Sequence, residues 1–491
     1  MSLNALFRAA LGAAAILALG AGAAQAQVAY TANTIQSLAY REFQKDGRFY
    51  VFNDLKKAEA FETSGEVGVG ITRPGLGPNG ETVVADSETA LELFLFKHGL
   101  HAEVTRPSPP PLNIVWRDGK TRFTVGSGFY LEMSNRIQLR YFHNFPDNSV
   151  KLAGTENAGN SKGNFTIRRA KFKLEGFMFR PELEFELQLN WPDVSGTPPA
   201  RFLEDANLDW DVTRGKKTFR VRFGQFKAAY GRQQLTSSGS QQFVDRAITD
   251  ARYNPGRETG LALWGTLGVT KFEWRTMVSN GNGRTQVAND NAAFLYTARA
   301  QYQLLGATRM NQWTSGAFLT EGDLGDSATG ALLAVAANFL KNDLRTFPTP
   351  GATPVTQNDN TQWGADAIFK SRGFSALVEY HDRKSKPYTD NVAGPDFKDR
   401  GFLVQASYAF KTPSLGPGPG YIEIAGRYAR IDPSDARGGD RQTEIGGAVS
   451  WYYSKHPFKL QADYRQLENE AANSGSGTKD DEFRLQMQFI F

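Results

Sequence analysis

Cysteine is absent from this sequence. The chain therefore has no disulfide framework, no thiol nucleophile and no cysteine-ligated metal site. Histidine is scarce, with 5 scattered residues, so a histidine-based metal site also lacks support. Charge is nearly balanced, with 56 Lys and Arg against 51 Asp and Glu, and no basic run stands out. Nucleic-acid binding is therefore not expected, and the sequence predicts no cofactor.

Long apolar runs are missing after the first 26 residues. Those 26 residues have the form of a secretory signal, with Arg8 before an apolar stretch at 9–19 and Ala24-Gln25-Ala26 as the cleavage pattern. The alternative is a single N-terminal membrane helix, which the short, Ala- and Gly-rich run disfavours. No later stretch reaches the ~20 apolar residues that a membrane helix needs. The exported chain is therefore predicted to be soluble or a membrane β-barrel.

Alternation of apolar and polar residues dominates the rest of the chain. The clearest case is the C-terminus, residues 483–491, which reads FRLQMQFIF and breaks the pattern only at Ile490. Residues 183–190 (LEFELQLN) and 219–224 (FRVRFG) alternate in the same way. Successive side chains of a strand point to opposite faces, so one set would face lipid and the other a lumen.

A soluble β-sandwich would produce the same alternation, but three features favour a membrane barrel. The segments are about ten to fourteen residues long, near the ~9–11 needed to cross a bilayer. Their connections alternate between short and long, as periplasmic turns and extracellular loops do. An unpaired edge cannot exist in lipid, so the C-terminal strand must close the sheet. We expect it to pair with the strand near residues 129–142.

The predicted fold is an all-β, antiparallel transmembrane β-barrel of about 16 strands over residues 129–491. Before it we expect a signal peptide at 1–26, a small mixed α/β periplasmic module at 27–106, and a linker and lead-in to the barrel at 107–128. Ser87 is expected to cap a short helix in the module. The predicted strands are 129–143, 163–176, 181–191, 202–213, 217–228, 257–267, 269–280, 292–305, 328–343, 361–371, 373–384, 398–411, 420–432, 440–454, 457–468 and 481–491.

Two connections stand out from the others. The 229–256 loop carries Phe243, Val244 and Ile248, which a loop in solvent would not need, so we expect it to fold into the lumen. The alternative is an outward cap over the pore. Segment 306–327 is too long for an ordinary periplasmic turn. It is predicted to hold an extra pair of strands, giving eighteen, or to fold as a structured turn.

Several stretches resemble the phosphate-selective porins O and P. They are residues 165–176 (FTIRRAKFKLEG), 203–210 (LEDANLDW), 221–246 (VRFGQFKAAYGRQQLTSSGSQQFVDR), 256–260 (GRETG) and the aromatic C-terminus. The resemblance covers about three quarters of the chain. It implies a sixteen-stranded, trimeric channel whose third extracellular loop folds into the pore. It also implies anion preference in members that have an arginine ladder and a basic central site.

The predicted function is that of a porin in the bacterial outer membrane, because a barrel of about sixteen strands encloses water. Its partners would be small hydrophilic solutes or inorganic anions, outer-membrane lipid, and further copies of the chain in a homotrimer. Guanidinium groups and hydroxyls suit phosphate, so cationic and serine residues in and beside the 229–256 loop are the candidate constriction. They are Arg220, Arg222, Lys227, Arg232, Ser237, Ser238, Arg246, Arg252 and Arg257.

Alternatives remain open at this point. Asp245 and Asp250 stand beside these cations, so arginine–acid pairs could simply hold the loop, and phosphate selectivity is not decided. Enzymatic function is not expected, because the neighbouring His381 and Asp382 come without a serine nucleophile motif. The second alternative is a structural or binding protein whose 27–106 module engages the cell wall or a periplasmic partner.

Overall fold

The computed structural model describes residues 39–100, 112–117, 119–146, 162–191, 202–267, 271–284, 289, 291, 293–306, 310, 313, 316–343, 356–389, 392–414, 418–436, 438–470 and 478–491. The expected signal peptide and the proline-rich stretch 106–111 lie outside these residues. The chain divides into two compact units, Met1–Pro109 and Pro110–Phe491, which are described separately. No helix in the described part of the chain is long and apolar enough to cross a membrane.

The first unit is a small mixed α/β fold, which confirms the predicted class of this module. Its sheet has the order β1-β2-β4-β3, and β2 and β4 are parallel. As predicted, the Ser87 hydroxyl caps a helix, accepting a hydrogen bond of 3.1 Å from the Ala90 N–H. The elements are β1 (Arg41–Lys45), β2 (Arg48–Phe52), α2 (Leu55–Ser64), β3 (Ile71–Arg73), β4 (Thr82–Ala85) and α3 (Glu88–Lys97).

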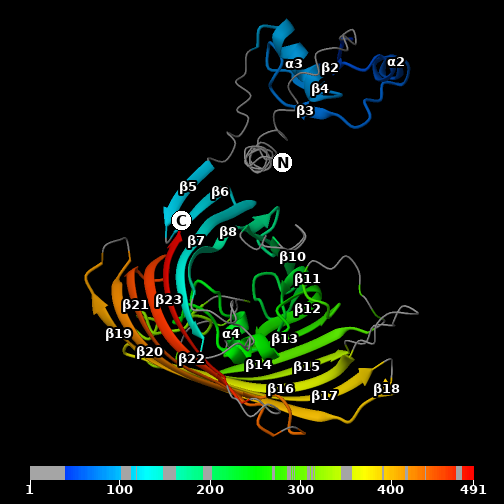
Figure 1. The fold of residues 1–491 in the computed structure, drawn as a ribbon. Helices are drawn as coiled ribbons and strands as arrows, with labels where there is room; N and C mark the ends of the chain where they lie inside the picture. The colour runs from blue at the N-terminus through cyan, green and yellow to red at the C-terminus, as the bar shows by residue number, and fades with distance from the viewer. Residues whose placement is uncertain are drawn as a thin grey trace. The chain divides into compact units, whose positions relative to one another are not determined.

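The second unit is a closed antiparallel barrel, in which the described residues form sixteen long strands (Figure 1). Each predicted strand has its counterpart. The terminal strand closes on the first, from Ile490 opposite Arg136 to Asp480 opposite Pro146, as expected. The strands are β7 (Phe129–Pro146), β8 (Lys162–Met178), β9 (Leu183–Asn190), β10 (Leu203–Asp211), β11 (Arg220–Lys227), β12 (Arg257–Leu267), β13 (Phe272–Ser279), β14 (Leu295–Leu305), β15 (Leu332–Asp343), β16 (Thr356–Ser371), β17 (Phe374–Thr389), β19 (Phe397–Thr412), β20 (Gly420–Asp432), β21 (Gln442–Ser454), β22 (Phe458–Asn469) and β23 (Thr478–Ile490), and a two-residue β18 (Val392–Ala393) pairs with β17.

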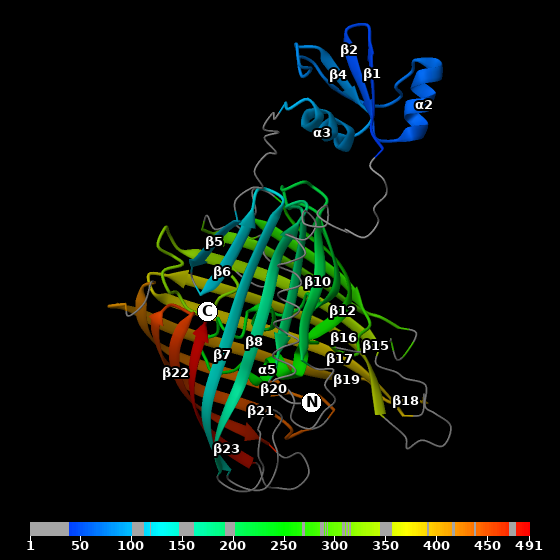
Figure 2. The same cartoon turned by 90° about the horizontal axis from the view of Figure 1, so that it is seen from above.

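A hairpin that the sequence did not predict precedes the barrel. Its strands are β5 (Leu112–Arg117) and β6 (Lys120–Val125), and β6 pairs with the first residues of β7, from Val125 opposite Phe129 to Thr121 opposite Met133. The remainder of β7 pairs with β23. The hairpin therefore extends the wall directly beside the C-terminus (Figure 2). Gly119 in its turn has a φ of 74°, and a Cβ there would lie 2.5 Å from the Ile490 carbonyl oxygen.

Short connections gather at one end of the barrel, which we call the turn end, and long ones at the other, the loop end. Arg372 and Gly373 make a two-residue connection with φ of 50° and 92°, the left-handed conformation that tight hairpins require. The exception at the turn end is the stretch between β14 and β15. Its described residues form turns and no strand, so the alternative of an extra strand pair there is not supported.

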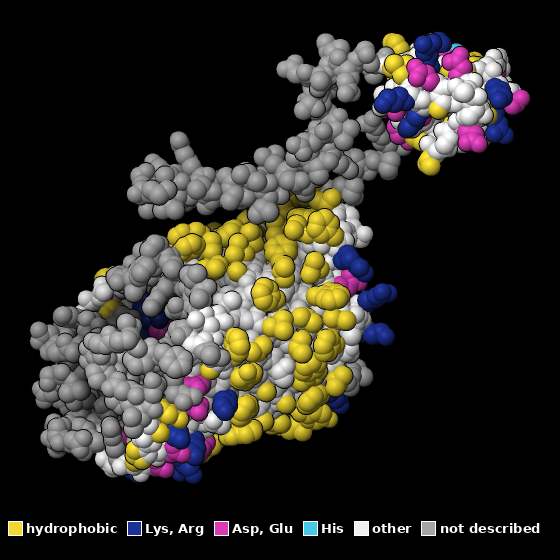
Figure 3. Space-filling model, turned by 90° about the vertical axis from the view of Figure 1, so that its right-hand side faces the viewer, with side chains coloured by type: hydrophobic (Ala, Val, Ile, Leu, Met, Phe, Trp, Pro, Cys, Tyr) yellow, Lys and Arg dark blue, Asp and Glu magenta, His cyan; other side chains and the backbone are white. Residues whose placement is uncertain are grey.

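The wall is apolar outside and polar inside. Leu208, Trp210 and Phe223 are each more than half exposed on the outer face, while Arg484 and Gln486 of β23 are buried within. On the side of the barrel seen in Figure 3, apolar side chains form a broad field and charged ones collect toward its edges. Such a band is the surface that a bilayer requires.

Candidate functional site

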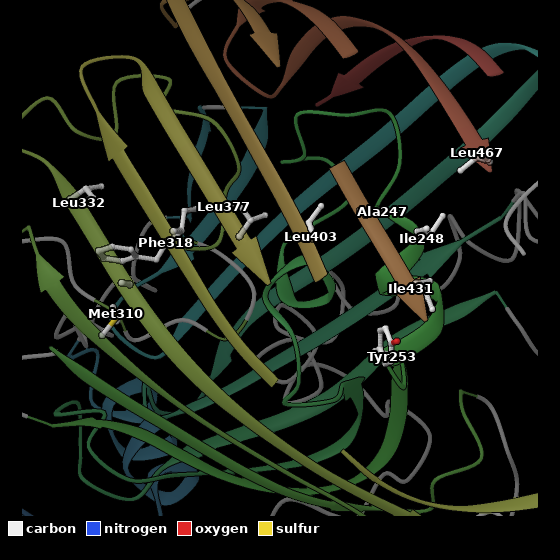
Figure 4. Packing of buried hydrophobic residues seen from close by; sticks show 13 residues of the cluster. Ala247, Ile248, Tyr253, Met310, Phe318, Leu332, Leu377, Leu403, Ile431 and Leu467 are labelled. Atoms are coloured by element: carbon white, nitrogen blue, oxygen red, sulfur yellow. The ribbon is translucent and has the colours of Figure 1, made fainter. Parts of the chain in front are cut away.

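The 228–256 loop folds into the lumen, which confirms the inward prediction and excludes the outward cap. It contains two short helices, α4 (Arg232–Leu235) and α5 (Ile248–Tyr253). Phe243 packs on Ala425 and Ala448 of the wall. Ile248 joins a buried cluster with wall residues that include Leu403 and Ile431 (Figure 4). The apolar residues in this polar loop are therefore its anchors.

The described residues between β14 and β15 (306, 310, 313 and 316–331) lie in the lumen and meet this loop. The Glu321 carboxylate accepts a 3.0 Å hydrogen bond from the Gln242 N–H, and the Glu321 N–H donates to the Ser240 carbonyl at 2.9 Å. The Trp313 indole donates to the Lys227 carbonyl at 3.1 Å. Phe318 lies in the same buried cluster as Ile248. Together the two segments pack on wall residues of β15–β22, and we call this side of the lumen the packed half. They also contact Ala262, Trp264 and Met277 of β12 and β13.

Cations in the packed half are held by carboxylates of the wall. The Arg232 guanidinium lies 2.8 Å from Asp366, which also pairs with Arg299. Arg252 lies 2.6 Å from Asp399. The structure thus places Arg232 and Arg252 away from the cavity that the other loop cations line. This separation differs from the grouping drawn from the sequence, because wall strands far along the chain supply both acids.

The opposite half, enclosed by β7–β12, contains a cavity of about 390 Å³ that we call the constriction cavity. Five of the nine candidate residues line it: Lys227, Ser237, Ser238, Arg246 and Arg257. Its lining holds four acids, Glu175, Glu186, Glu204 and Asp205, against nine cations, Lys120, Arg136, Arg168, Arg169, Lys171, Lys173, Lys227, Arg246 and Arg257. The cavity therefore carries a net positive charge.

Two of these cations have neutral partners. The Arg136 guanidinium donates to the hydroxyls of Ser238 and Ser237 at 2.9 and 3.0 Å. The Lys227 ammonium donates to the carbonyl oxygens of Leu235 and Thr236 at 3.1 and 3.0 Å. Among the described residues, no carboxylate lies within 4.0 Å of either cation. Lys227 is buried and Arg136 is half-buried. Charge withdrawn from water in this way is stabilised by a counter-ion, and here that ion is negative.

Sequence reasoning missed the cations of β7 and β8. Arg168 and Arg169 are adjacent, so simple alternation would send one of them to the lipid face. The register between β7 and β8 shifts at Arg168, where Gln138 faces Arg169 and Leu139 faces Ile167. This β-bulge lets both side chains line the cavity. The only sequence signal was the motif RRAK at 168–171.

Arg220 and Arg222 line a second cavity of about 660 Å³ nearer the turn end, which we call the vestibule. The Asp209 carboxylate lies 2.8 Å from the Nε of Arg220, and it also accepts a 2.7 Å hydrogen bond from the Nε of Arg222. The Arg222 guanidinium is 4.7 Å from the centre of the Trp313 ring. These two cations are therefore paired and held in place within the wall.

Two carboxylates of the loop are in contrasting surroundings. Burial acts to raise the pKa of Asp245, but the guanidinium of Arg140 at 2.7 Å and those of Arg168 and Arg169 outweigh it and hold that pKa well below its usual range. Burial raises the pKa of Asp250 to about 6, although Arg246 at 3.7 Å opposes the shift. Asp245 therefore stays charged and paired with wall arginines, whereas Asp250 changes its charge near pH 6.

Comparison with known proteins identifies the family. The model of the family described as phosphate-selective porin O and P matches residues 138–491. The chain belongs to this porin family. An uncharacterised protein of Aquifex aeolicus (strain VF5) is 23% identical to the porin over 302 residues, 58% of this chain and 67% of that protein. Among solved structures, the anion-selective porin from Comamonas acidovorans aligns with a TM-score of 0.47 at 12% sequence identity. The alignment covers 73% of this chain and 99% of the Comamonas chain. The outer membrane channel DcaP of Acinetobacter baumannii has a TM-score of 0.47 at 13% identity, with 75% and 99% covered.

Membership places the porin in the bacterial outer membrane as a channel for small solutes. In such barrels the short turns and the chain ends face the periplasm and the long loops face outward. The turn end is therefore periplasmic. A solute that enters from outside meets the constriction cavity first and the vestibule second.

Proposed function

We propose that this porin prefers anions, that phosphate is among them, and that the constriction cavity selects them. The observation that carries the proposal is the excess of nine cations over four acids in its lining. Arg136 and Lys227 are the most telling of these, since their partners are hydroxyl and carbonyl oxygens. A passing anion is the counter-ion that this part of the pore lacks.

The geometry of the constriction cavity also allows a bound anion to leave. Arg136 and the Ser237 and Ser238 hydroxyls offer a phosphate several weak hydrogen bonds, and Arg246 and Lys227 lie in the same lining. Arginine offers two parallel donors to an oxyanion, while lysine acts as a point charge. Conduction requires sites strong enough to admit an ion and weak enough to let it leave. Several neighbouring cations that each bind an anion weakly meet that requirement, because the anion can pass from one to the next.

Reversal potentials in a planar bilayer under a KCl gradient test the proposal. We expect wild type to favour chloride, phosphate to block the chloride current, and Lys227→Gln or Arg136→Gln each to lower the anion-to-cation permeability ratio about two- to fivefold. Arg246→Ala should weaken the phosphate block. The matched control is Arg252→Gln, a loop cation paired with Asp399 outside the cavity, which should leave the ratio unchanged.

The competing interpretation is that these cations serve only to hold the loop. It predicts a cation-preferring or non-selective wild type, or cavity variants with the same ratio and phosphate block as Arg252→Gln. Either result would refute the selecting role of the cavity while leaving the channel itself in place. The stability of each variant, measured in parallel, separates loss of selectivity from loss of the loop.

Three further proposals accompany this function. The first is that the porin assembles as a homotrimer, which native mass or cross-linking of the purified protein tests. The second is that residues 27–106 form a periplasmic module, released from a signal peptide at 1–26 and followed by a linker and lead-in at 107–128. Leu112 lies level with Phe129 at the periplasmic end of the barrel, which supports a periplasmic approach of the chain. N-terminal sequencing and protease accessibility test this arrangement.

The third proposal is that transport is the whole activity. His381 is 1% exposed inside the barrel, beside Tyr230 at 3.1 Å. Asp382 follows it on the strand and therefore points outward, where it pairs with Arg400 at 2.9 Å. The two side chains lie on opposite faces of the wall and do not act together. Hydrolysis of a lipid ester or peptide that depends on His381 would overturn this proposal.

A further inference from the structure

In the β5–β6 hairpin, β6 alternates between cationic and apolar or hydroxyl side chains as a wall strand does, whereas every residue of β5 is exposed. Leu112, Ile114 and Trp116 alternate along β5 and are 59%, 56% and 55% exposed. By register, Ile114 is opposite Phe123, and Phe123 is opposite Leu131 of β7, so this apolar face continues the outer surface of the barrel. The other face of β6 carries Lys120 and Arg122 on the lumen side. The hairpin therefore belongs to the channel wall.

Its two cations neutralise acids at the periplasmic mouth. Lys120 contacts the Glu132 carboxylate and lies 3.1 Å from Glu175. Arg122 Nε lies 2.8 Å from Glu132. Glu132 is 6% exposed, and its remaining hydrogen-bond partner among the described residues is the Tyr130 hydroxyl at 2.9 Å. Without the hairpin cations, Glu132 would be a buried carboxylate with no cation beside it.

The charge of the vestibule depends on these two side chains. Its lining has six cations and seven acids, so it is close to neutral while the hairpin is charged. Removal of Lys120 and Arg122 would leave four cations against the same seven acids. A mouth lined in that way repels anions, because charge in a narrow, low-dielectric passage sets which ions enter.

We propose that the β5–β6 hairpin is a selectivity element of the periplasmic mouth, in which Lys120 and Arg122 cancel the charge of Glu132 and Glu175 so that anions pass. This inference rests on the proposed anion preference. Lys120, Arg122 and Glu132 precede the stretch matched by the family, 138–491, and Glu175 lies within it. Lys120 also lines the constriction cavity, as do Lys173, Glu175 and Glu186, so these four side chains border both parts of the path.

The test uses the full-length porin in planar bilayers under a KCl gradient. In Lys120→Gln/Arg122→Gln the anion-to-cation permeability ratio should fall about two- to fourfold. Adding Glu132→Gln and Glu175→Gln to this variant should restore the ratio. In the wild-type hairpin, Glu132→Gln/Glu175→Gln should raise it, a change of opposite sign that a folding defect does not produce.

A matched control removes two cations from the outer surface. Lys384→Gln/Arg400→Gln breaks the exposed pairs with Asp396 and Asp382 and should leave the ratio unchanged. If the hairpin variant matches this control while wild type prefers anions, the hairpin inference is overturned and the proposed function stands. If wild type shows no anion preference, the proposed function fails. The hairpin inference then survives only if its variant still shifts the ratio toward cations.

Discussion

The two halves of the lumen carry similar kinds of side chain but use them differently. In the packed half, Arg232 and Arg299 share Asp366, and apolar anchors such as Phe243 and Ile248 fill the space between loop and wall. In the opposite half, enclosed by β7–β12, Arg136 and Lys227 face neutral oxygens at the constriction cavity. Matched charge together with apolar contact lets protein fill a region. Unmatched charge keeps a region open to water and to a mobile counter-ion.

The test with the largest expected effect removes the part of the 228–256 loop that occupies the packed half. Replacing loop residues 236–250 with a short Gly-Ser connection should raise single-channel conductance roughly threefold and reduce anion preference, since the loop bears the anchors and Arg246. Single-channel recording measures both quantities. An unchanged conductance would mean that the loop does not occupy the lumen in the membrane.

A second test asks whether charge matching stabilises only the packed half. Asp366→Asn leaves Arg232 and Arg299 without their shared, buried carboxylate, so we expect it to lower the free energy of unfolding by about 3–5 kcal/mol. Lys227→Gln removes a cation that has only neutral partners, and we expect a loss below about 1 kcal/mol. Denaturant unfolding in lipid vesicles compares the two. Equal losses would remove the energetic distinction between the halves.

The smallest expected effect concerns pH. Asp250 has a pKa raised to about 6, so it loses its charge as pH falls through that value and no longer offsets Arg246. The anion-to-cation ratio should rise by less than about twofold between pH 7 and pH 5. The folded-state pKa of Asp250 exceeds the ordinary value of about 4, so the folded protein binds this proton more tightly than the unfolded chain does. The contribution of Asp250 to the free energy of unfolding is therefore greatest below about pH 4 and declines as pH rises from about 4 to about 6. Asp250→Asn should abolish both effects, and persistence of the pH response in that variant would point to another group.

Prediction from sequence succeeded where the information is local. The strands of the barrel follow from period-two alternation, and the pairing of β23 with β7 follows from the need to close the sheet in lipid. The inward course of the 228–256 loop could be read from Phe243 and Ile248, because apolar residues in a polar loop require a surface to pack on. The β5–β6 hairpin escaped prediction, since its strands are short and follow a proline-rich stretch.

The sequence by itself determined the class, the number of long strands and the inward course of the 229–256 loop, because these depend on patterns within single strands and loops. It did not predict that the segment between β14 and β15 also enters the lumen. Only the tertiary structure decided which cations line the pore. The bulge at Arg168 turned two adjacent arginines inward, while Asp366 and Asp399 drew Arg232 and Arg252 to the wall. Residues separated by more than a hundred positions meet in these contacts, and their pairing follows from strand register around the whole barrel, which no local pattern encodes.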